Sequence, residues 1–242
     1  MSESKYNLSN AKFGGGFAEG TQTGGTLNDN STNNFINQNS ENVEGNATDV
    51  KTILVLAANP KTTSHIRLDE EVREIDAGLQ RARNRKAFNL QVRWAVRVRD
   101  VAQALLDFQP QIVHFCAHGG GDDGLALEDE TGRVQYVSTT AIAELFELFS
   151  QRNNQNQKNP IECVILNACY SAVQATAISQ HVSYTIGMNQ AIGDKAAIEF
   201  AVGFYSALAA GESIDFAYKL GCNTIAMAGI PENLTPILVK RE

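Results

Sequence analysis

Short apolar runs alternate with amphipathic segments from Val50 to the C-terminus. The run VKTILVLAANP, residues 50–60, is rich in β-branched residues and ends at an Asn-Pro pair, as a buried strand does. In residues 68–84, apolar side chains recur every three or four positions, which predicts a helix. Acidic residues are concentrated at the start of this segment and basic residues at its end, which is the order that the helix dipole favours.

The same alternation continues along the rest of the chain. Further strands are expected at residues 89–96, 112–117, 161–166, 184–187 and 237–239, and further helices at residues 100–108, 139–149, 171–181, 194–210 and 213–227. Residues 124–136 resemble a short polar excursion, and residues 150–160 a polar linker. Strand-helix alternation of this kind predicts an α/β fold, with a mainly parallel sheet and helices on both faces.

The first 48 residues have a different composition from the rest. They are dominated by Asn, Gly, Ser and Thr, with isolated aromatic residues, and cannot build a core. We expect residues 1–48 to be a flexible low-complexity segment and residues 49–242 to form the globular domain. The alternative for the segment is a self-assembly motif, because aromatic and Gln/Asn residues in a low-charge background are prone to cross-β pairing.

Charge and composition narrow the classes of partner. A net charge of −7 with interspersed signs provides no basic stripe for nucleic acid and no polybasic anchor for a membrane. No apolar run reaches membrane-spanning length and no signal peptide is apparent, so a cytoplasmic location is expected. The four cysteines lack C-x-x-C spacing, which argues against a zinc knuckle or a disulfide framework. A protein or a small molecule is the expected partner.

Two polar residues follow expected strands. His118 comes directly after VHFCA and begins the run HGGG, and Cys169 follows VILNA after about fifty residues. Functional groups collect at the carboxyl ends of parallel strands, so these two would meet if their strands are neighbours. A helix start favours the cysteine thiolate, and the glycines from Gly119 can donate backbone N–H groups to an oxyanion. Together they form a candidate nucleophile, base and electrophilic pocket.

Each of these residues also has a plainer interpretation. A lone cysteine after a buried strand is more often part of the core, which is also the expectation for Cys116, Cys163 and Cys222. His114, inside a strand, is expected to be a packed residue or a support for the loop below the site. A glycine triplet can cradle phosphate, but no G-x-G-x-x-G or P-loop lysine completes that motif.

Four segments in order resemble the CHAT proteins, a bacterial branch of the caspase-like cysteine peptidases. These are LVLAANPKTTSHIRLDEEVREI, VHFCAHGGGDDGLALED, ILNACYSA and IGMNQAIGDKAAIEFAVGFYSALAAGESIDFAYKLG. The resemblance implies a caspase-like three-layer α/β sandwich and a cysteine endopeptidase without metal or organic cofactor. Cys169 would attack the peptide carbonyl, His118 would protonate the leaving amine, and the N–H groups of Gly119 and Cys169 would hold the oxyanion.

The substrate-binding residues are less well indicated. Metacaspase-like relatives place an aspartate two residues before the nucleophile. It helps to bind a basic P1 side chain, which is the side chain just before the cleaved bond. This chain has Asn167 at that position. Asp194 is a second candidate for the missing charge, although an Asp at a helix start is more often an N-cap. Cys116, Asn167 and Asp194 are the candidate substrate-binding residues.

The resemblance further implies an effector in bacterial defence or cell death. Activation by a separate sensor or activator, recruited through the N-terminal segment, is expected. Residues 173–193 contain no Lys, Arg, Asp or Glu, so no processing linker is expected after the cysteine. The alternative function is a non-catalytic caspase-like interaction module.

Overall fold

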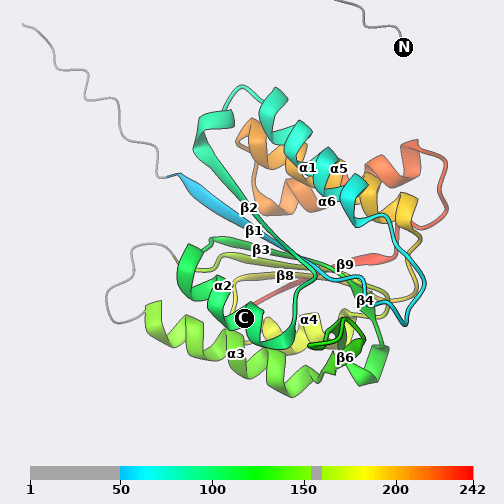
Figure 1. Ribbon diagram of the computed structural model, residues 1–242. Coiled ribbons are helices and arrows are strands. Elements are labelled where there is room, and N and C mark those ends of the chain that lie inside the picture. Colours follow the sequence, from blue (N-terminus) through cyan, green and yellow to red (C-terminus); the bar gives the residue numbers. More distant parts are fainter. Residues whose placement is uncertain (1–49, 154–159, 242) are drawn as a thin grey trace, which may run out of the picture. The chain divides into compact units, whose positions relative to one another are not determined.

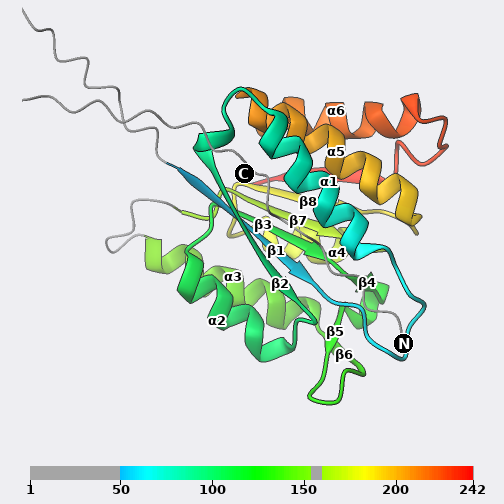
Figure 2. The ribbon, with the colours of Figure 1, turned by 45° about the horizontal axis from the view of Figure 1, so that its top comes forward.

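The computed structural model describes residues 50–153 and 160–241, so the expected N-terminal segment lies outside the described residues. Its centre is a six-stranded sheet in the order β2-β1-β3-β7-β8-β9, drawn in Figures 1 and 2. The strands are β1 (Lys51–Ala57), β2 (Phe88–Trp94), β3 (Ile112–Cys116), β7 (Cys163–Asn167), β8 (Tyr184–Met188) and β9 (Pro236–Lys240). All pairs are parallel except β8 with β9.

Helices cover both faces of this sheet (Figure 1). One face carries α1 (Leu68–Arg81), α5 (Asp194–Ala210) and α6 (Ile214–Met227), and the other carries α2 (Val98–Phe108), α3 (Thr139–Asn153) and α4 (Ala172–Ile178). Short 3-10 turns lie at Arg85–Ala87 and Gly121–Asp123. The predicted α/β sandwich with a mainly parallel sheet is confirmed.

The hydrophobic core consists of two clusters, one on each face of the sheet. Alternate residues of a strand point to opposite faces, so Ile53 and Val55 of β1 pack under α1 and α5, whereas Leu54 and Leu56 pack over α2. All four side chains are completely buried. Burial on both faces explains why these strands have continuous apolar sequences rather than an alternating pattern.

A second, antiparallel sheet is formed by β4 (His118–Gly119), β5 (Leu125–Glu128) and β6 (Val134–Val137). The sequence interpretation of residues 124–136 as a polar excursion was therefore wrong. The turn between β5 and β6 is held by Asp129, whose carboxylate accepts from the N–H groups of Thr131 and Arg133. Hydrogen bonds to this carboxylate lower the pKa of Asp129, and the bond from the Arg133 amide contributes most.

Among the residues described, no helix combines the length and the apolar character that crossing a membrane requires.

Candidate active site

Strand pairing brings His118 and Cys169 together. The neighbouring parallel strands β3 and β7 are in a register that places Cys116 opposite Asn167. His118 and Cys169 each lie two residues beyond this pair, at the carboxyl ends of their strands. A Cβ built on Gly119 would lie 1.8 Å from the carbonyl oxygen of Cys169, so these two backbones touch. Only glycine allows the chain after the histidine to approach the cysteine so closely.

The orientation of His118 is set by a main-chain carbonyl. Its Nε2 lies 2.7 Å from the oxygen of Ser64, in the loop between β1 and α1. A carbonyl oxygen only accepts, so Nε2 carries the proton and Nδ1 keeps a lone pair. His118 is thus held in the tautomer whose Nδ1 can act as a base.

The sulfur of Cys169 contacts the backbone of one residue. Sγ lies 3.4 Å from the nitrogen and 3.6 Å from the oxygen of Ile192. The N–H donates to the sulfur, and a protonated thiol can donate to the carbonyl, so both protonation states of Cys169 have a partner. The amide that contacts the sulfur therefore comes from the loop before α5, not from the helix start after the cysteine.

The turn that carries Cys169 is anchored to two strands. Tyr170 has a left-handed backbone, φ 55°, which costs a non-glycine residue about 1–2 kcal/mol. Its N–H donates to the carbonyl of Gln190 at 3.2 Å. Ser171 Oγ donates to Leu166 O at 2.9 Å and accepts from the N–H of Met188 at 3.0 Å. These bonds attach the strained turn to both β7 and β8, and so fix the position of the cysteine.

His118 and Cys169 line one small cavity of about 40 Å³. Asn167 and Asp194, two of the candidate substrate-binding residues, also line it. Asp194 is not the N-cap of α5, since Gly193 takes that position. Its carboxylate instead accepts from the backbone N–H of Arg67, at 3.4 Å.

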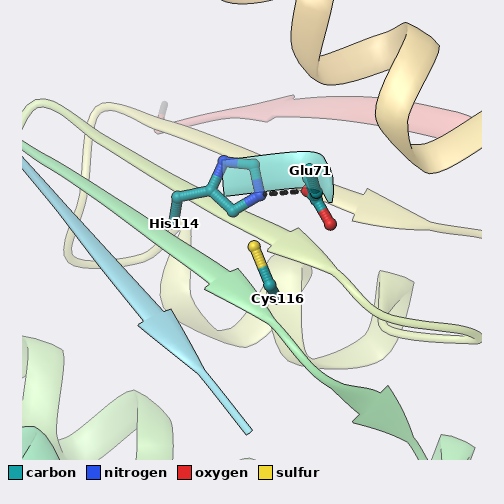
Figure 3. A group of neighbouring side chains, drawn as sticks. All are labelled: Glu71, His114 and Cys116. Carbon is teal, nitrogen blue, oxygen red and sulfur yellow. Dashed lines mark hydrogen bonds and ion pairs between the residues drawn. The ribbon is translucent and has the colours of Figure 1, made fainter. Parts of the chain in front are cut away.

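The third candidate, Cys116, does not reach the cavity. It is completely buried and points toward Glu71 and His114, as Figure 3 shows. Burial, followed by the charge of Glu71, raises the pKa of its thiol well above the usual value. The structure therefore places Cys116 in the core behind the site, where it cannot touch a substrate.

A buried hydrogen-bond network lies beneath the cavity. Glu71 of α1 and His114 of β3 are joined at 2.9 Å between Oε1 and Nε2, and His114 Nδ1 lies 2.9 Å from the hydroxyl of Tyr205 in α5 (Figure 3). Burial raises the pKa of Tyr205, so its hydroxyl keeps its proton. A carboxylate oxygen accepts, so His114 Nε2 carries a proton and donates to Glu71.

Three residues in and beside this network are also of the types that bind metal ions. Ligand atoms of Glu71, His114 and Cys116 lie within 4.8 Å of one another, a spacing that metal sites also show. However, both imidazole nitrogens are engaged by protein groups, and the thiol is held in its protonated form by burial. The chemistry of this group is that of a hydrogen-bond network that supports the cavity. It extends the sequence interpretation of His114 as a support below the site.

Comparisons with known proteins show the family and the fold of this chain. Residues 32–219 match the family model for the CHAT domain. The chain is 26% identical over 184 residues to a "Probable protease" of Gillisia limnaea, covering 76% of this chain and 31% of that protein. It is 24% identical over 190 residues to a "Roc-COR-CHAT protease" of an unknown prokaryotic organism, covering 78% of this chain and 18% of that protein.

A solved structure with a similar fold is the Drosophila initiator caspase Dronc. It matches with a TM-score of 0.51 and 9% identity, over 81% of each chain, which is evidence for the fold alone. The chain spans less than a third of either curated relative, so the likeness concerns one domain of those proteins. The family match covers most of the chain, and the fold likeness covers 81% of it. The chain therefore belongs to the CHAT family and has a caspase-like fold.

Proposed function

We propose that this protein is a cysteine endopeptidase with Cys169 as nucleophile and His118 as general base and acid. The observation that carries the proposal is the pairing of β3 with β7, which brings the two residues to one cavity. The Ser64 carbonyl adds a second argument, because it leaves His118 Nδ1 free to accept a proton.

The reaction follows from these positions. Cys169 Sγ attacks the carbonyl carbon of the substrate, and the thiol proton moves to His118 Nδ1. The oxyanion accepts from the N–H groups of Gly119 and Cys169; the latter donates to no protein group within the described residues. His118 then gives its proton to the leaving amine as the C–N bond breaks. Water, deprotonated by His118, hydrolyses the thioester and restores the thiol.

A labelling experiment tests this proposal. A peptide library identifies a cleaved sequence, and a peptide with the same sequence and a thiol-reactive end group serves as the probe. We expect the probe to label Cys169 in the wild type and not in His118→Ala. Cys222→Ala is the matched control, because Cys222 is another half-buried free cysteine and its loss should leave the labelling unchanged.

Two results would contradict the peptidase. One is an identical product pattern from Cys169→Ala; the other is the absence of both cleavage and labelling with every candidate activator. The second result favours the non-catalytic interaction module. Circular dichroism of each variant shows whether it retains the fold.

The proposed biological role is an effector of bacterial defence or cell death that a partner protein switches on. The curated relatives support regulation, since the matching region is a minority of each and the remainder can control it. For this chain we assign that control to a protein partner that contacts residues 1–48. Deleting these residues should abolish activation by the partner and leave basal peptide cleavage intact. Activation that survives the deletion would contradict this role for the segment.

A further inference from the structure

The edge strand β2 ends in a half-exposed tryptophan beside an open cavity. Trp94 is the only tryptophan of the chain, and it is 52% exposed. It lines a cavity of about 300 Å³, the Trp94 cavity, whose other apolar wall residues include Ile66 and Leu68. A large apolar side chain gains stability when a partner covers it, and tryptophan is enriched where partner proteins bind. The Trp94 cavity is therefore a candidate docking site.

The polar side chains of the Trp94 cavity indicate the charge of its occupant. Asp69, in the first turn of α1, and Glu128, the last residue of β5, line it, and no lysine or arginine among the described residues does so. The arginines next to these acids in the fold are paired with other carboxylates: Arg67 with Glu70 and Asp194, and Arg97 with Asp100 and Glu130. Charge complementarity thus favours a cationic occupant.

An arginine side chain matches both the apolar and the acidic walls. Its planar guanidinium stacks on the face of an indole and donates paired hydrogen bonds to a carboxylate. A cavity of about 300 Å³ is at the lower end of the range for ligand pockets, about 300–1,000 Å³, so it suits a single side chain better than a large cofactor. The expected occupant is an arginine that a partner protein presents.

The walls of the Trp94 cavity also hold the loop that orients His118. The side chain of Asn59 donates to the carbonyl of Ile66 at 3.1 Å, and the backbone N–H of Asn59 donates to Glu128 Oε1 at 3.2 Å. Asn59, Ile66 and Glu128 all line the cavity. Ser64, whose carbonyl binds His118 Nε2, lies in the loop that the Asn59–Ile66 bond closes. An occupant of the cavity therefore contacts the residues that fix this loop.

We propose that the Trp94 cavity binds an arginine side chain of a partner protein, stacked on Trp94 and held by Asp69 and Glu128, and that this binding fixes the loop that orients His118. The binding is independent of the proposed peptidase function, whereas its effect on turnover rests on that function. A fixed loop holds His118 in the tautomer that accepts the thiol proton, so occupancy should raise turnover.

The fluorescence of the single tryptophan measures this binding directly. The full-length protein is titrated with the peptide acetyl-Gly-Arg-Gly-amide and with the same peptide carrying citrulline in place of arginine. Citrulline has nearly the shape of arginine without its charge. We expect a saturable change in the emission of Trp94 with the arginine peptide, and a Kd at least about tenfold lower than that of the citrulline peptide.

Variants identify the groups that recognise the charge. Asp69→Asn and Glu128→Gln should each raise the Kd of the arginine peptide about three- to tenfold, because each removes one carboxylate. Glu128→Gln keeps an oxygen that can accept from the Asn59 N–H. Asp76→Asn is the matched control and should leave the Kd unchanged, because Asp76 lies on the same helix as Asp69 but does not line the cavity.

Turnover tests the link to His118. With the arginine peptide at saturation, kcat for a cleaved substrate should rise about fivefold or more in the wild type, the usual lower range for coupled sites. The citrulline peptide at the same concentration should raise kcat by a smaller factor, since it occupies less of the cavity.

The outcomes separate this inference from the proposed function. Equal Kd values for the two peptides, or unchanged emission with both, overturn the docking site and leave the peptidase standing. Binding with unchanged or lower kcat overturns the link to His118. Binding that occurs only after deletion of residues 1–48 assigns the cavity to this chain's own segment and overturns the partner. If no peptide is cleaved and no probe labels Cys169, the proposed function fails, and the fluorescence still decides the docking site. Should a variant not fold, the comparison of the two peptides in the wild type is sufficient.

Discussion

Replacing Gly119 by alanine tests the contact between the two halves of the site. The new Cβ would lie 1.8 Å from the carbonyl oxygen of Cys169, 2.8 Å from its carbonyl carbon and 3.0 Å from its nitrogen. An ordinary contact is about 3.5 Å, so the backbones must separate by about 1.7 Å. The displacement acts directly on the nucleophile and on the N–H groups proposed for the oxyanion.

The expected loss of activity is large. A misplacement of about 1 Å can lower the rate about 100-fold. We therefore expect kcat/KM of Gly119→Ala to fall at least about 100-fold, equivalent to about 2.7 kcal/mol at 1.36 kcal/mol for each factor of ten. The free energy of unfolding should fall by about 1–3 kcal/mol, as for other overpacked sites.

Gly121→Ala is the control from the same glycine triplet. Its Cβ would meet nothing closer than Tyr170 Cβ at 3.7 Å, although φ is +60° and alanine there costs about 1–2 kcal/mol. The two variants should lose similar stability in urea unfolding, and only Gly119→Ala should lose kcat/KM. Full activity in Gly119→Ala, or an equal loss in both variants, would refute the argument from displacement.

Three other predictions concern stability and maturation. Tyr205→Phe removes the hydroxyl that pairs with His114 and should lower the free energy of unfolding by about 1–3 kcal/mol, as measured in urea. Arg97, chiefly through a side-chain hydrogen bond, lowers the pKa of Asp100, so this pair stabilises the fold above pH 3.8 and the contribution is lost as pH falls through the lowered value. Asp100→Asn should cost up to about 1 kcal/mol at pH 7 and progressively less below pH 3.8. Mass spectrometry of activated protein should show an uncut chain across residues 173–193, and a stoichiometric cut there that activity requires would prove this wrong.

The principal elements of the site could be predicted because their signals are local. The runs before His118 and Cys169 are short and apolar and end in small or polar residues, which indicates two buried strands with functional groups at their ends. The structure adds that β3 and β7 are neighbours, with Cys116 opposite Asn167. His118 and Cys169 lie just beyond the ends of these strands, and both line one cavity with Asn167 and Asp194.

Other parts of the site had no such signal. Ser64 acts through its carbonyl, which every residue has, so its side chain says nothing about that role. Glu71 stands in an acidic first turn, which the helix dipole explains equally well. Only its position three residues after Leu68 and four before Ile75, on the apolar stripe of α1, marks it as buried.

The histidine and the cysteine belong to different sheets. His118 pairs with Ala126 in the small antiparallel sheet, while Cys169 follows a strand of the large one, and Ala117 alone separates β3 from β4. A displacement of the β5–β6 hairpin therefore moves His118 directly, and it reaches Cys169 through the backbone contact at Gly119. A ligand that displaces this hairpin should therefore lower thiol alkylation and peptide turnover together, although it binds away from the cavity beside Cys169.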